Sequence, residues 1–234
     1  MNPSKLSLLA LIITCAAMIS HPLFAQTNPE DSLPYKAYEI GIFGTGGVCI
    51  FNGTVPDGSK TDIHSAFTFG ALAAIAANRD IGFALGIGYE ARGMFFKQQN
   101  VTTPNETIGL NYLSIQPSIR FKSFLLGINI GLPMSSSFDT SGDVSPSNAG
   151  FFTKDHMGTV IDIRATGLLP IVENDIGNLY FIIQLSYPVS NAMKDGFFTV
   201  NQTNHTTSDL ITKSPIPTVQ AGLSYLFSPG AKTK

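Results

Sequence analysis

The sequence predicts an all-β protein: an eight-stranded, antiparallel, up-and-down transmembrane β-barrel that is preceded by a cleaved signal peptide. Large apolar residues alternate with small or polar ones, with a period of two, in eight segments of the chain. Most of these segments are longer than an average strand of roughly 5–6 residues and match the about 9–11 residues that cross a bilayer. Short and long connections also alternate between the segments, which is typical of outer-membrane barrels.

The N-terminus has the features of a secretory signal peptide. Lys5 supplies a positive charge, an apolar run follows over residues 6–19, and Ala25 marks a cleavage point before Gln26. Cys15 leaves a lipoprotein alternative open, although the apolar run continues past it. We therefore expect a signal peptide over residues 1–25, a short periplasmic segment over 26–36, the barrel over 37–228 and a C-terminal tail over 229–234.

Each predicted strand has one face of large apolar side chains. In the stretch IGFALGIGYEARGMFF (81–96), Ile81, Phe83 and Leu85 alternate with glycine and alanine, and Glu90 and Arg92 continue the face of small residues. The same pattern places strands over residues 38–48, 66–76, 81–96, 110–122, 124–132, 157–169, 179–189 and 216–227.

The connections predict the register and the topology. The two-residue turn 122–123 makes Phe121 and Phe124 cross-strand partners, and the turn 78–80 makes Ala77 and Ile81 partners, all on the apolar face. A third short turn lies within 173–178. The remaining connections are long: 52–62, 97–106, 133–156 and 190–214. Both ends of the barrel chain are therefore expected on the side of the short turns, with the long loops on the other side.

Alternation alone does not decide which face points outward, and a soluble ligand-binding barrel is the alternative. The apolar faces carry no charge, whereas the opposite faces are rich in glycine, alanine and serine, which suit the narrow lumen of eight strands. We predict that Arg92 and Arg120 share the carboxylates of Glu90 and Asp162 as a polar plug. The whole predicted lumen network is Glu39, Glu90, Arg92, Arg120, Lys122, Asp162 and Arg164.

The composition limits the partners. The formal net charge is −2 and only 13% of residues are charged, so nothing indicates a nucleic-acid partner. The expected partner is outer-membrane lipid, with a protein or a surface polymer as a further candidate at the long loops. The chain has no tryptophan, so tyrosine and phenylalanine have to form the interfacial girdles.

Three stretches resemble the PorT-type outer-membrane β-barrel domain family. They are GIGYEARG (86–93), NYLSIQPSIRFK (111–122) and the closing strand VQAGLSYLF, which ends at Phe227. The sequence departs from the family pattern at Gln116, which precedes Pro117, and in the tail that continues after Phe227. The resemblance implies an integral protein of the Gram-negative outer membrane, with a link to protein secretion in some members.

Histidines in the long loops raise the alternative of an outer-membrane enzyme that acts on lipid A or on protein. His64, His156 and His205 are spread along the chain, and no spacing among them defines a catalytic triad or a set of metal ligands. We therefore expect no enzyme activity, no cofactor and no catalytic or metal site.

Overall fold

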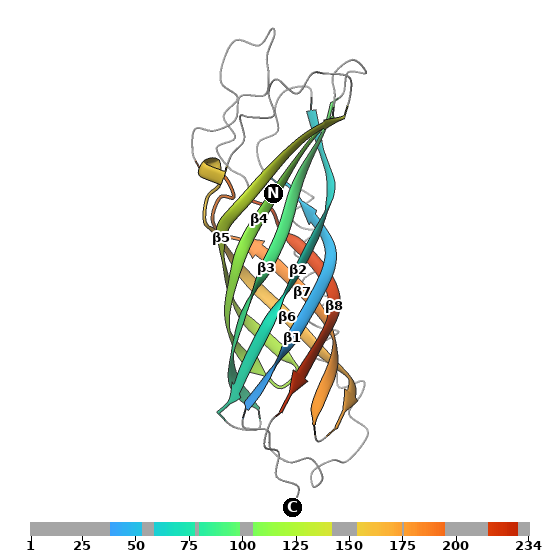
Figure 1. The fold of residues 1–234 in the computed structure, drawn as a ribbon, viewed down its shortest axis with the longest axis vertical. Coiled ribbons are helices and arrows are strands. Elements are labelled where there is room, and N and C mark those ends of the chain that lie inside the picture. The colour runs from blue at the N-terminus through green and yellow to red at the C-terminus, as the bar shows by residue number, and fades with distance from the viewer. Residues whose placement is uncertain are drawn as a thin grey trace, which may run out of the picture. The chain divides into compact units, whose positions relative to one another are not determined.

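The computed structural model describes residues 38–52, 59–77, 80–98, 105–141, 154–174, 176–194 and 215–228. Its strands form one closed barrel in the chain order β1 to β8 (Figure 1). They are β1 (Tyr38–Ile50), β2 (Ser59–Ala76), β3 (Ile81–Gln98), β4 (Asn105–Phe121), β5 (Phe124–Ser141), β6 (Val160–Glu173), β7 (Gly177–Pro188) and β8 (Thr218–Phe227), with a 3₁₀ turn, η1 (Lys154–His156), before β6.

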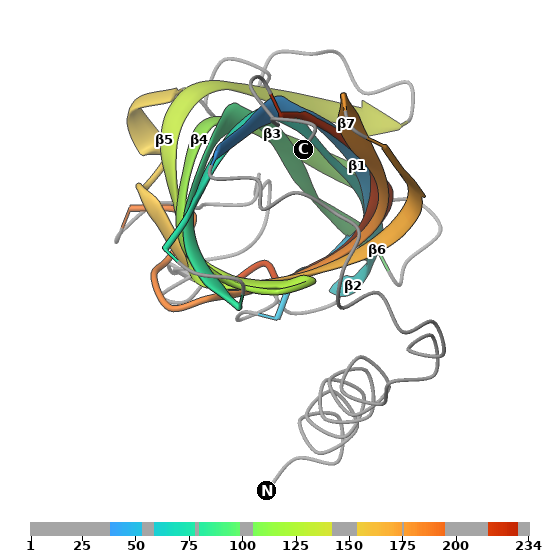
Figure 2. The same ribbon diagram turned by 90° about the horizontal axis from the view of Figure 1, so that it is seen from below.

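Every strand pairs antiparallel with its neighbours in the chain, and β1 closes the ring by pairing with β8. Viewed along its axis, the barrel is a complete ring of strands (Figure 2). The predicted fold class of eight antiparallel up-and-down strands is therefore confirmed. Among the described residues, no helix is both long and apolar enough to cross a membrane.

The short turns have the predicted registers. Phe121 pairs with Phe124, and the amide of Ala77 donates to the carbonyl of Ile81 at 2.9 Å. In the turn between β6 and β7, the Asn174 side chain accepts hydrogen bonds from the amides of the second and third residues after it, which fixes this turn locally.

The middle strands are longer than predicted. Strands β2 to β5 have 17 or 18 residues, whereas the other four have 10 to 14. The additional length lies at the long-loop end, where β2 to β5 rise above the rest of the barrel (Figure 1). On β5 the outward face of this added length is polar, with exposed Ser135, Ser137 and Asp139, so the alternation with large apolar residues ends before the strand does.

Several predictions concern residues outside the described ranges. They are the signal peptide (1–25), the periplasmic segment (26–36), the C-terminal tail (229–234) and His205, and these stay predictions.

Candidate functional site

Four charged side chains meet inside the barrel toward its long-loop end. Arg92 of β3 donates from Nε to Glu90 Oε1 at 2.8 Å and forms an ion pair with Asp162 of β6. Arg164 of β6 donates from one terminal nitrogen to both carboxylate oxygens of Glu90, each at 2.9 Å. We call Glu90, Arg92, Asp162 and Arg164 the loop-end cluster, and their side chains are at most 5% exposed.

Neutral side chains complete the hydrogen bonding of this cluster. Asn129 of β5 donates to Glu90 at 3.1 Å and to Asp162 at 2.8 Å, and the Ser114 hydroxyl donates to the Asn129 oxygen at 2.5 Å. Two positive and two negative charges are thus buried together with several hydrogen-bond partners. Burying charges costs several kcal/mol each unless partners of this kind are present, so the cluster is stable only as a unit.

A second polar group lies near the short-turn end. Arg120 of β4 forms an ion pair with Glu39 of β1, and its guanidinium lies 3.5 Å from the Tyr180 hydroxyl. The Asn178 amide donates to Glu39 at 3.1 Å and to Tyr180 at 2.9 Å. We call Glu39, Arg120, Asn178 and Tyr180 the turn-end cluster.

Arg92 contacts both of the carboxylates that the prediction assigned to it, Glu90 and Asp162, but the prediction is wrong for Arg120, which pairs with Glu39 instead. The register explains why: Arg92 is paired with Leu110, which lies toward the opposite end of β4 from Arg120. The second arginine of the loop-end cluster is Arg164, which pairs with Glu90.

Lys122 was also predicted in the lumen, and this is wrong. It occupies the two-residue turn between β4 and β5 with a φ of 49°, so strand alternation does not direct its side chain inward. The Lys122 side chain is 74% exposed and lies 3.2 Å from Asp80 in the neighbouring turn. The other six predicted lumen residues face the interior.

The lumen between the two clusters is filled with side chains. The hydroxyls of Thr45 and Thr68 donate to Gln220 Oε1 at 2.5 and 2.9 Å. A layer of apolar residues that includes Phe43 and Leu125 lies inside as well. These two line a cavity of about 30 Å³, which is room for one or two water molecules.

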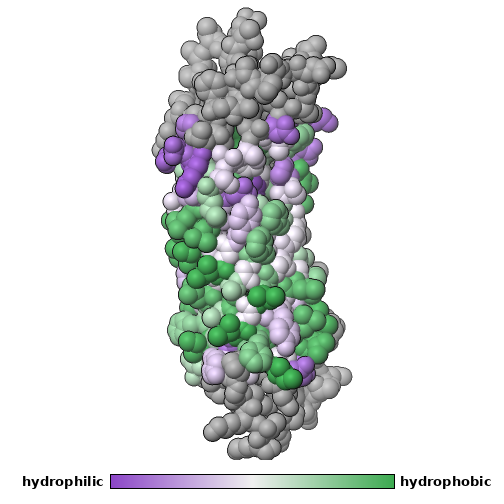
Figure 3. Space-filling view, in the orientation of Figure 1, coloured by the Kyte–Doolittle hydropathy of each residue, from purple (hydrophilic) through white to green (hydrophobic). Residues whose placement is uncertain are grey.

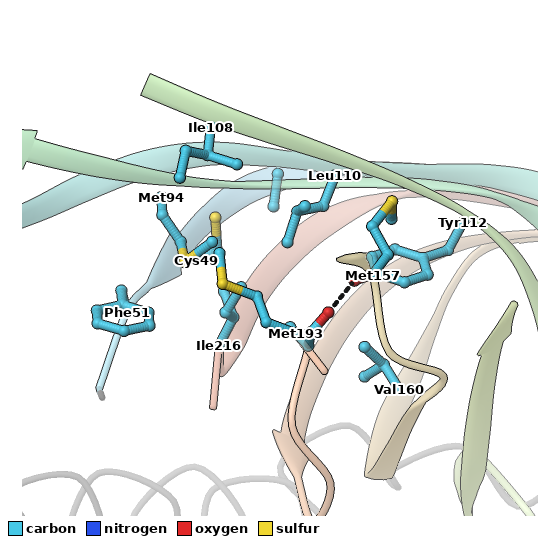
Figure 4. Packing of buried hydrophobic residues seen from close by; sticks show 12 residues of the cluster. Cys49, Phe51, Met94, Ile108, Leu110, Tyr112, Met157, Val160, Met193 and Ile216 are labelled. Carbon is cyan, nitrogen blue, oxygen red and sulfur yellow. Dashed lines mark hydrogen bonds between the residues drawn. The ribbon is translucent and has the colours of Figure 1, made fainter. Parts of the chain in front are cut away.

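An apolar cap lies in the barrel on the long-loop side of the loop-end cluster. Figure 4 shows how its side chains pack together. Met157 and Met193, from the connections on either side of β6 and β7, form an isolated antiparallel bridge. The Tyr112 hydroxyl donates to the carbonyl of Ala192 at 3.3 Å. We define the cap as Cys49, Phe51, Ala66, Met94, Ile108, Leu110, Tyr112, Met157, Val160, Ala192, Met193 and Ile216, all of which are buried.

Periodicity in the sequence did not predict this cap. It placed Met157 in a strand and left Met193 unassigned, because an isolated apolar residue in a long connection has no periodicity. The available signal was the presence of large apolar residues in otherwise polar loops.

Two of the three candidate histidines, His64 and His156, lie in described segments. The His64 ring nitrogen Nδ1 is 2.9 Å from the carbonyl of Ser65, and the ring covers the backbone of Gly93 so closely that a Cβ there would clash. His156 ends η1. Within the described ranges, no group of three His, Cys, Asp or Glu side chains is arranged to hold a metal ion.

The outer surface carries a continuous band of large apolar side chains. Every strand contributes exposed residues at its outward positions, among them Ile42, Phe83 and Ile163, each more than half exposed. Figure 3 shows hydrophobic residues over the height of the barrel wall and hydrophilic ones above them. We call this band the apolar belt.

Aromatic residues lie toward both ends of the apolar belt. Tyr38 and Phe227 are exposed near the short turns. Nearer the long loops, Phe67, Phe69 and Tyr89 pack together on the outer surface with ring centroids 5.4 to 6.5 Å apart, and Ile63 continues the apolar belt beyond them on β2. They supply the aromatic girdles that the chain has to form without tryptophan.

No family model and no curated protein matches the chain. Several solved structures are similar to it at low identity, among them the following three. Neisserial surface protein A is 12% identical, with 79% of this chain and 95% of that chain covered and a TM-score of 0.37. Ail of Yersinia pestis, solved with a heparin analogue, is 15% identical, with 81% and 97% covered and a TM-score of 0.34. The outer membrane protein AlkL, solved in lipid bilayers, is 13% identical, with 90% and 100% covered and a TM-score of 0.38.

Proposed function

We propose that the chain is an integral outer-membrane β-barrel protein with a closed lumen, which acts as an accessory or binding protein through the part of the barrel that faces the cell exterior. The observation that carries this proposal is the sorting of side chains. Large apolar residues point outward on all eight strands, while six charged residues point inward.

Lipid is the environment that fits this sorting. In a bilayer every backbone polar group needs a partner within the protein, and a closed barrel provides one without a free edge. An outward apolar band flanked by aromatic girdles is the typical surface of such barrels. A soluble carrier would have the reverse arrangement and would need a ligand cavity of about 300 Å³ or more, whereas the two cavities that described residues line inside the barrel have about 30 and 20 Å³.

The closed lumen is supported at three levels. The apolar cap, the loop-end cluster and the turn-end cluster follow one another along the barrel interior. Eight strands leave an interior just wide enough to be filled by side chains. With the lumen filled, the strands β2 to β5 that rise beyond the apolar belt are the surface available to partners.

For the biological role we propose only a class of partner. The PorT-type resemblance suggests a role linked to protein secretion, and it rests on the strand motifs alone, since no family model matches. A protein or a surface polymer outside the cell is the partner class that this reading implies.

Fractionation tests the location. We expect the protein in the outer-membrane fraction, extractable only with detergent, and recovery as a soluble periplasmic protein would contradict the proposal. Protease added to intact cells should cut within 133–156 or 190–214. Cleavage confined to 78–80 or 173–178 would place the long loops on the periplasmic side instead.

We also propose that the chain has no catalytic activity. The enzyme alternative predicts that His64→Ala or His156→Ala changes the lipid A profile or the processing of surface proteins. We expect mass spectra of lipid A and of surface proteins to be identical for wild type and both variants.

A further inference from the structure

Two lysines lie opposite each other on the outside of the barrel. Lys60 of β2 and Lys97 of β3 are direct cross-strand partners, and both are exposed. Met94 is completely buried, so the alternation along β3 turns Phe95 and Lys97 outward. The register places Lys60 and Asp62 on this same outer face.

This arrangement is unfavourable without an anion. Side chains of direct cross-strand partners have Cβ atoms about 4.5–5.5 Å apart, and like charges at such positions repel. Among the described residues, the ion pairs involve neither Lys60 nor Lys97. Asp62 is the one acidic residue beside them on this face within the described part of the chain, and it accepts a hydrogen bond from the amide of Ile63 at 2.8 Å and lies in none of these ion pairs. Among the described residues, two positive charges therefore face one negative charge.

The position of the two lysines along the barrel indicates which kind of anion binds them. Ile63, which is 58% exposed, is the last large apolar side chain on β2 before the lysines, so the pair lies where the apolar belt ends. In an outer-membrane barrel this is the level of the lipid headgroups. The exposed lysine at the other end of the barrel, Lys122, is different because it already has a carboxylate partner, Asp80.

We propose that Lys60 and Lys97 together bind a phosphate group on the headgroup of an outer-leaflet lipid. Two ammonium groups on neighbouring strands can both donate to the oxygens of one phosphate, and charge-assisted hydrogen bonds of this kind are short and strong. The bound phosphate removes the repulsion between the lysines and fixes the depth of β2 and β3 in the membrane. This inference rests on the proposed membrane location.

The test compares melting temperatures in vesicles of defined composition. The purified full chain is folded into phosphatidylcholine vesicles that contain lipid A, dephosphorylated lipid A or neither. For the wild type, we expect lipid A to raise the melting temperature by about 2–4 °C over dephosphorylated lipid A. Lys60→Ser with Lys97→Ser should lose this shift, Lys60→Arg with Lys97→Arg should keep it, and the matched control Lys122→Ser should also keep it. High salt should reduce the shift, because the site is exposed.

Each of the other outcomes contradicts a specific part of the proposal. An equal shift in wild type and the double serine variant would place lipid binding elsewhere. An equal shift with inorganic phosphate in detergent micelles, against chloride at the same ionic strength, would replace the lipid by any free anion. If the protein folds in plain vesicles and shows no phosphate-dependent shift, this inference fails while the membrane location stands. If it folds in no vesicle, both fail.

Discussion

Arg92 on β3 reaches across the lumen to Asp162 on β6, a strand with which β3 has no hydrogen-bonded pairing. The contact is made through the barrel interior and ties opposite walls together. Its members are almost completely shielded from water, and each has further partners within the loop-end cluster. The cluster therefore contributes to stability in a way that no single strand pairing does.

Replacing Arg92 by alanine should destabilise the barrel strongly. The change leaves Glu90 and Asp162 buried with one arginine between them, and removing one partner of a buried ion pair costs about 3–5 kcal/mol. Urea unfolding in lipid vesicles measures this. The control is Lys122→Ala, which breaks an exposed ion pair and should cost less than about 1 kcal/mol. Equal unfolding midpoints for wild type and Arg92→Ala would remove Arg92 from any structural role.

The two polar clusters should act independently. We expect Arg92→Ala and Glu39→Gln to have additive effects on the free energy of unfolding, to within about 0.5 kcal/mol, because they lie in separate clusters. Arg92→Ala and Asp162→Asn should be non-additive, since neutralising Asp162 relieves part of the charge left unpaired by the first change. Strong coupling between Arg92 and Glu39 would indicate one continuous plug instead of two clusters.

The outward face should tolerate charge only above the apolar belt. Leu85 lies on the outer face of β3 with 45% of its surface exposed, and arginine at a lipid-facing midplane position costs about 2–4 kcal/mol. We expect Leu85→Arg to lower the unfolding midpoint in vesicles accordingly. The matched variant Ser137→Arg, on the outer face of the protruding part of β5, should be nearly neutral. Similar tolerance at both positions would favour a soluble barrel.

The sequence was sufficient to predict the barrel and the residues on its outer and inner faces, because period-two alternation is a local signal that each strand carries by itself. Ile81, Phe83 and Leu85 are outward as predicted, and Glu90 and Arg92 are inward. The turn residues fixed the registers, since a two-residue connection at 122–123 leaves one alignment that keeps both apolar faces on the same side.

The interior contacts were harder to predict. Which arginine meets which carboxylate depends on the relative height of residues on tilted strands that are distant around the ring, as the assignment of Arg120 to Glu39 shows. The cap escaped prediction for another reason: Met193 reaches the lumen from a long connection, where no periodic pattern defines direction. Lys122 was misassigned because alternation was extended into a turn.

The barrel should not conduct ions, and opening its cap should not change this. Tyr112 packs in the cap and binds the carbonyl of Ala192, so Tyr112→Ala should free the connection after β7 and speed its cleavage by protease at the cell surface. The loop-end cluster lies below the cap and pairs its positive and negative groups, whereas a selective pore has rings of one sign around water. In planar bilayers we therefore expect no steady current from either wild type or Tyr112→Ala, with a porin added to the same bilayers as the positive control.

Reproducible unitary conductance of the wild type would contradict the closed lumen. Conductance of Tyr112→Ala alone would mean that the cap, and not the charged cluster, is the barrier.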